Sequence, residues 1–164
     1  MHRWAMYGGG EDLVRVAGFV EPWLLGAADR LHADTGFAAL DRYTADTDAS
    51  PWERATGFPW WERDVTATLW GYGWGTLLSP VHVAAVGGAA ALGALREVVP
   101  AARVRDVGEG RTWVTLGDDP GAVTADEVAA LRRVLLPALP RGARTFEDFE
   151  RAVARGEVTE RLVL

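Results

Sequence analysis

Residues 66–80 read TATLWGYGWGTLLSP, in which an expected strand leads directly into an expected helix. The aromatic and β-branched side chains of residues 66–78 predict a long strand. Glycines at three alternate positions within it, Gly71, Gly73 and Gly75, indicate a bulge or a close approach of another part of the backbone. The Ser-Pro pair that follows predicts a helix start, with serine as the N-cap and proline in the first turn.

Two helical segments and a hairpin are expected next along the chain. The helix that begins at Pro80 runs to Val86, is interrupted by two glycines, and resumes over residues 89–98. Strands over residues 103–107 and 112–116 flank Gly-Glu-Gly-Arg, a sequence typical of a hairpin turn.

The C-terminal part is expected to be helical. Thr124 and Glu127 form a capping box, which predicts the start of a helix. The apolar face of this helix is expected to consist of Val128, Leu131, Leu135 and Ala138. Residues 141–164 predict a helical appendage, with Thr145 as the cap of its helix.

The N-terminal part predicts a strand, a helix and a second strand. Residues 13–19 are apolar apart from Arg15 and predict the first strand. Glu21-Pro22 then predicts a helix start, because proline is well tolerated in a first turn. The apolar stripe of that helix is Trp23, Leu24, Ala27, Ala28 and Leu31. Gly36 is expected to end the helix, and residues 37–44 predict the second strand.

The expected order of elements favours an α+β fold. Hairpin and crossover connections both occur, which predicts one largely antiparallel sheet with helices packed on a face. The length of 164 residues suits a single domain over residues 1–164, with residues 141–164 as its C-terminal helical appendage. The hydrophobic content of 49% is ordinary for a globular protein and argues against wholesale disorder.

The composition removes several classes of chemistry. The chain has no Cys and no Lys, so we expect no disulfide, no thiolate nucleophile, no Cys-ligated zinc and no lysine Schiff base. A net charge of −6 argues against general nucleic-acid binding, which needs a cationic surface. The N-terminus lacks the apolar core of a signal peptide, and no run of about 18 apolar residues is present. We therefore expect a cytoplasmic protein that does not engage a membrane.

Two apparent ligand-binding motifs do not fit their patterns. Residues 71–76 begin like a dinucleotide fingerprint, but Thr76 stands where a third glycine is needed. Residues 46–57 begin like a calcium loop, but Pro51 and Gly57 stand where glycine and glutamate are required. No His-x-x-x-His pair is present to bind zinc. We therefore expect no metal and no cofactor.

Candidates for catalysis are few. Neither serine lies in a Gly-x-Ser-x-Gly elbow, and His82, in the first turn of a helix, is expected at the surface. Glu62 and Asp64 share one face if their segment is extended, as a pair of carboxylates for acid–base chemistry requires. Trp60 and Trp61 beside them could stack on a sugar or a base. A small-ligand-binding protein or hydrolase with a Trp-lined cleft is therefore one alternative. The competing interpretation is that the two tryptophans form a hydrophobic anchor under a loop and bind no ligand.

Net negative charge and tryptophans are concentrated in the N-terminal half. Seven of the eight tryptophans lie there: Trp4, Trp23, Trp52, Trp60, Trp61, Trp70 and Trp74. Residues 41–64 also carry six acids against three arginines. We therefore expect the N-terminal half to carry the principal binding surface.

A series of features over residues 70–140 carries a family resemblance. An aromatic strand leads into GWGTLLSP at residues 73–80, and HVAAVGG follows at residues 82–88. A short helix, a strand that turns at GEG over residues 108–110, an apolar strand and a helix that ends in Leu-Pro complete the order. This order resembles the C-terminal half of the type VI immunity family, small proteins of bacterial polymorphic toxin systems that neutralise a cognate toxin.

The resemblance implies inhibition by binding, without catalysis. The implied partner is a cognate toxin protein, and an acidic, Trp-rich surface would suit a cationic toxin site. The expected partner-binding residues are Asp46, Asp48, Glu53, Trp60, Trp61, Glu62, Asp64, Tyr72 and Trp74. A homodimer that forms through an exposed aromatic patch is a third interpretation.

Overall fold

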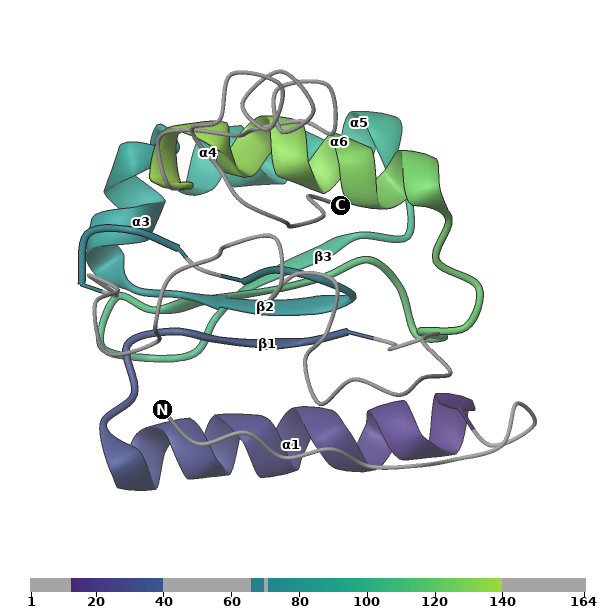
Figure 1. Ribbon diagram of the computed structural model, residues 1–164, viewed down its shortest axis with the longest axis horizontal. Coiled ribbons are helices and arrows are strands. Elements are labelled where there is room, and N and C mark those ends of the chain that lie inside the picture. The colour runs from purple at the N-terminus through teal and green to yellow at the C-terminus, as the bar shows by residue number, and fades with distance from the viewer. Residues whose placement is uncertain (1–12, 40–65, 70, 140–164) are drawn as a thin grey trace, which may run out of the picture.

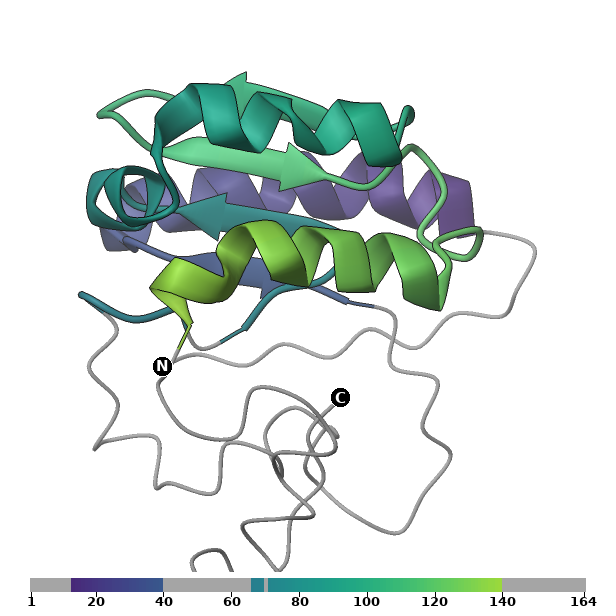
Figure 2. The ribbon, with the colours of Figure 1, turned by 90° about the horizontal axis from the view of Figure 1, so that it is seen from above.

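Three layers make up the part of the chain that the structure describes (Figure 1). The computed structural model describes residues 13–39, 66–69 and 71–139. A sheet lies in the middle, helix α1 lies against one of its faces, and the other helices lie against the opposite face (Figure 2). The elements in chain order are α1 (Leu13–Leu31), β1 (Gly36–Ala38), β2 (Gly75–Leu78), α3 (Pro80–Ala85), α4 (Gly88–Gly93), α5 (Leu95–Val98), β3 (Arg103–Asp106), β4 (Thr112–Thr115), α6 (Ala125–Leu135) and η3 (Leu136–Ala138).

The sheet pairs its four described strands antiparallel, in the order β1-β2-β4-β3. In its centre, Leu77 lies opposite Trp113 and Thr76 lies opposite Val114. Side chains alternate between the two faces of a sheet, so Leu77 and Trp113 pack with α1 whereas Val114 joins the core under the other helices. The predicted α+β fold is confirmed, and helices cover both faces of the sheet.

Helix α1 is continuous over Leu13–Leu31, so the predicted strand over residues 13–19 is wrong. Pro22 lies inside this helix and not in its first turn. Local preference opposes a helix here, because proline removes a backbone donor and the preceding segment contains β-branched valines. Packing of one helical face against the sheet outweighs that preference.

Small and apolar residues at helical spacing form the inner face of α1. Ala17 and Ala28 are buried, and Leu24 packs against the cluster on this side of the sheet. The predicted apolar stripe is therefore only partly correct. Trp23 and Leu31, which it placed on the buried face, are 39% and 58% exposed.

The end of α1 differs from the predicted end at Gly36. The helix stops at Leu31. His32 then takes a left-handed conformation with φ of 49°, and the amide of Ala33 donates to the carbonyl of Ala28 at 2.8 Å. These contacts terminate the helix, and β1 begins at Gly36.

Strand β2 is much shorter than the predicted strand over residues 66–78. The backbone reaches β-geometry only at Gly75, because the amide of Gly73 donates to Oγ1 of Thr76 at 3.1 Å in a local turn. The predicted close approach is confirmed. A Cβ added at Gly73 would lie 2.7 Å from the carbonyl oxygen of Ala38, and one added at Gly75 would lie 2.4 Å from the ring of Trp113.

The elements predicted between Leu78 and Leu139 are confirmed, except that the helix expected over residues 89–98 is divided into α4 and α5. Ser79 is the N-cap of α3, and α4 begins at Gly88, after a break at which Gly87 and Gly88 both have positive φ. Strands β3 and β4 form the expected hairpin. The capping box of Thr124 and Glu127 begins α6, whose residues Leu131 and Leu135 are fully buried.

The predicted surface position of His82 is wrong, since its side chain is completely buried. Its Nδ1 lies 2.9 Å from Oγ of Ser79, which also accepts a hydrogen bond from the backbone amide of His82 at 3.3 Å. The imidazole of His82 thus contacts the capping hydroxyl of α3 in a position from which solvent is excluded. Ser79 is 3% exposed, so this pair is structural and not a nucleophile with access to substrate.

Some predicted elements lie outside the described residues. These are the part of the second strand beyond Ala39 and the helical appendage of residues 141–164. None of the helices in the described ranges combines the length and the apolar composition that a membrane span needs.

Candidate functional site

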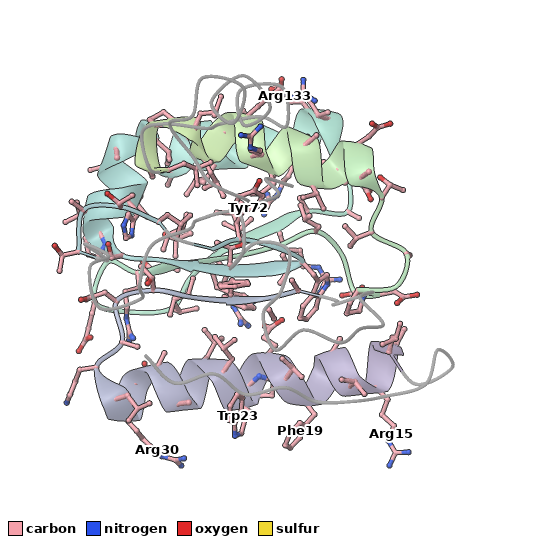
Figure 3. The ribbon with its side chains drawn as sticks, in the orientation of Figure 1. Arg15, Phe19, Trp23, Arg30, Tyr72 and Arg133 are labelled. Carbon is pink, nitrogen blue, oxygen red and sulfur yellow. The ribbon has the colours of Figure 1, made fainter. Side chains whose placement is uncertain are left out.

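The outer face of α1 is the candidate site, and we define it by Arg15, Phe19, Trp23 and Arg30. Figure 3 shows all four side chains pointing away from the sheet. Their spacing of four, four and seven residues places them along one side of the helix. Gly26 lies on the same side between Trp23 and Arg30, and a Cβ added there would have no atom within 4 Å.

Exposed apolar side chains are concentrated on this helix. Phe19 is 58% exposed and Trp23 is 39% exposed. Four of the six large apolar residues that are exposed within the described ranges belong to α1. A scattered exposed leucine or valine is ordinary, but aromatic residues that adjoin on one helical face indicate an interaction surface.

The charged residues of α1 are sorted between its two faces. Glu21 pairs with Arg105 of β3, and Asp29 lies 2.5 Å from Arg111 next to β4. Both acids of the described helix are therefore neutralised at the sheet. Arg15 and Arg30 take part in none of the ion pairs among the described residues, so the outer face is cationic although the whole chain is acidic.

Tyr72 and Trp74, two of the predicted partner-binding residues, are buried at 7% and 5% exposure. Burial raises the pKa of the Tyr72 phenol, and the charge and hydrogen bond of Arg132 oppose that rise. The indole of Trp74 donates to the carbonyl of Gly117 at 2.7 Å. These contacts assign both residues to the core, because a buried side chain offers no surface to a partner.

The other predicted partner-binding residues lie outside the described residues. They are Asp46, Asp48, Glu53, Trp60, Trp61, Glu62 and Asp64. The acidic segment and the carboxylate pair of the hydrolase alternative therefore stay predictions. Within the described ranges, no group of three or more His, Asp or Glu side chains is placed to hold a metal ion.

The sequence contained a signal for the outer face of α1. Phe19 and Trp23 are four residues apart, and Arg15 precedes Phe19 by the same interval. Division of the segment at Pro22 hid this pattern, because it assigned Phe19 to a strand and Trp23 to a separate helix. Because α1 continues through Pro22, Phe19 and Trp23 belong to the same helix.

Comparisons of the chain with protein-family models, with curated proteins and with solved structures find no match. The resemblance to the type VI immunity family therefore stays a prediction, and a function for this chain has to be inferred from the geometry of its described residues.

Proposed function

We propose that this chain is an immunity-type protein that binds and neutralises a cognate bacterial toxin. The observation that carries the proposal is the exposed Phe19–Trp23 pair on the outer face of α1, with an arginine toward each end of the helix. Aromatic residues and arginine contribute most of the binding energy in many protein interfaces. A surface rich in them supports action by docking on another macromolecule.

The way in which α1 is held on the sheet supports the same proposal. Its inner face packs on the sheet through Ala28 and Leu24, and ion pairs to Arg105 and Arg111 hold it at two points. A side chain on a fixed helix loses little freedom when a partner binds, so less of the interaction energy is spent on ordering.

The acidic segment of residues 41–64 would add charge complementarity to a cationic toxin site. Reversal of Asp46, Asp48 and Glu53 to arginine is expected to slow association with the toxin, and the effect is expected to shrink as salt is added. An unchanged association rate would remove this segment from the proposed interface.

Co-expression tests the function itself. The proposal predicts that a gene beside this chain's encodes a protein with a C-terminal toxin module, and that module is expressed in a bacterial host with and without this chain. Protection by the chain, together with a stable complex of the two purified proteins, is the expected result. Death of the host in both cases, or protection without any complex, would contradict neutralisation by binding.

A further inference from the structure

We propose that the outer face of α1 docks onto a protein surface on which carboxylates flank an apolar hollow. This inference rests on the proposed function, because the protein in question is the toxin. It goes further by giving the chemistry of the partner's surface. The outer face of α1 requires acidic groups on the toxin, whereas residues 41–64 require cationic groups. The two surfaces are therefore expected to contact different parts of the toxin.

The spacing of the outer face gives dimensions for that partner surface. Arg15 and Arg30 are fifteen residues apart, so about 22 Å of helix lies between them. Phe19 and Trp23 are about 6 Å apart along the same axis. A complementary surface therefore places its two acidic groups about 22 Å apart, with the hollow for the aromatic pair nearer the carboxylate that meets Arg15.

Gly26 adds a shape requirement. It lies one turn beyond Trp23 on the same side of α1, and open space surrounds the position of its missing Cβ. The face is thus notched between Trp23 and Arg30. A side chain of the partner fits this notch and contacts the helix backbone, as occurs where two elements approach closely at glycine.

A second copy of the chain is a poor occupant of the outer face. An antiparallel pair of α1 helices would place Arg15 of one copy near Arg30 of the other, and a parallel pair would place each arginine near its own counterpart. Among the described residues, the outer face contains no carboxylate to neutralise either arrangement. Like charges brought together at an interface weaken association, so a partner with acidic groups is favoured.

Charge also argues against a nucleic acid or a membrane. Only two arginines lie on the outer face, whereas tight binding to DNA or to anionic lipid commonly uses four or more cations. The net charge of −6 would repel both polyanions at longer range. A protein can supply two carboxylates and a hollow without that general repulsion.

Charge reversal tests the inference directly. The probe is the neighbouring toxin module, purified as a catalytically silent variant. Arg15→Glu with Arg30→Glu is expected to slow association about tenfold or more. The difference is expected to shrink between about 0.1 M and about 1 M salt, as the Debye length falls from about 10 Å to about 3 Å.

Arg133→Glu is the first matched control for this experiment. Arg133 is exposed on α6, on the far side of the sheet from α1 (Figure 3), and a single reversal there is compared with each single reversal on α1. Equal slowing by Arg133→Glu would show an effect of net charge alone and would overturn the inference.

Gly26→Leu tests the notch without removing any contact within the chain. Leucine favours a helix more than glycine does, so the variant is expected to fold at least as stably, yet to bind the toxin module about tenfold more weakly. Gly18→Leu is its control, since Gly18 is another glycine of α1 with open space around its Cβ position, but lies to the side of the outer face. Equal affinity of the Gly26 and Gly18 variants would overturn the predicted fit.

The alternative partners of the outer face, namely a second copy of the chain, a membrane and a nucleic acid, are tested with the same variants. Sedimentation measures self-association, phosphatidylcholine vesicles with phosphatidylserine represent a membrane, and a short DNA duplex represents nucleic acid. Binding in any of these assays that is lost with Arg15→Glu and Arg30→Glu would overturn the assignment to an acidic protein surface. Failure of the unaltered chain to protect would overturn the proposed function, whereas full protection and unchanged binding by every α1 variant would overturn this inference alone.

Discussion

The carboxylate of Asp29 on α1 lies 2.5 Å from the guanidinium of Arg111, which is 82 residues farther along the chain. Arg111 has a side chain only 8% exposed, whereas that of Asp29 is 64% exposed. The contact fixes one end of α1 to the hairpin of β3 and β4, and the Glu21–Arg105 pair fixes the helix at a second point. Because both acids turn toward the sheet, the arginines are left on the outer face.

Substitutions of the Asp29–Arg111 pair are expected to have unequal costs. Asp29→Ala should lower the free energy of unfolding by about 1 kcal/mol, since Asp29 is solvated and Glu109 stays 3.5 Å from Arg111. Arg111→Ala should cost about 2 kcal/mol or more, because it removes both contacts and a buried stem. Urea unfolding measures both variants, and equal losses would contradict this account of the pair.

Gly75→Ala is expected to destabilise the fold by about 1–3 kcal/mol, since the new methyl group would overlap the ring of Trp113 in a filled core. Gly18→Ala is the matched control, because it adds the same atom where nothing lies within 4 Å, and should stabilise α1 by up to about 1 kcal/mol. Thermal unfolding followed by circular dichroism separates them. A neutral Gly75→Ala would show that Trp113 moves freely.

The second half of the fold could be predicted because its signals are local. Ser79 caps α3 with its own side chain, and the box of Thr124 and Glu127 closes within a single turn. The break at Gly87 and the hairpin turn at residues 108–111 require backbone conformations that glycine adopts readily. Each of these features depends on residues close together in the chain, so it can be recognised from the sequence.

The first half could not be predicted as well, because its structure depends on distant contacts. Residues 13–19 have the largely apolar, β-branched composition of a strand, and burial of the inner face of α1, which includes Ala17 and Ala28, makes a helix favourable. Tyr72 and Trp74 were expected on a partner surface for their chemistry alone, but the three-dimensional packing buries them. Of the candidate site, the tryptophan content and the net negative charge indicated the N-terminal half, whereas the helical face that carries Phe19 was not predicted.

Ser79→Ala is expected to cost more than an ordinary N-cap. Loss of a capping hydroxyl costs about 1 kcal/mol, which is the effect expected for Thr124→Ala at the exposed start of α6. Ser79→Ala should cost about 2 kcal/mol, because it also removes the hydroxyl bound to the buried Nδ1 of His82. Chemical denaturation compares the two variants, and equal costs would contradict a structural Ser79–His82 pair.

The stability of the protein is expected to fall at alkaline pH through Tyr72. Burial raises the pKa of this phenol above 10.0, so the folded chain keeps a proton that the unfolded chain has lost. The contribution is therefore fully present below pH 10.0 and is lost as the pH rises through the folded pKa, by at most about 1.4 kcal/mol per pH unit. Tyr72→Phe should remove this slope in unfolding measurements across that range. An identical slope in the variant would contradict the assignment.

The most direct measurement of the central claim is the affinity of the double variant Phe19→Ala, Trp23→Ala for the neighbouring toxin module. Val98→Ala on α5 is the control, because Val98 is 63% exposed and lies on the other side of the sheet. The double variant is expected to remain folded, to bind at least about tenfold more weakly and to lose protection on co-expression, while the control behaves as the unaltered chain does. Unaltered affinity and full protection by the folded double variant would show that this protein does not act through the outer face of α1.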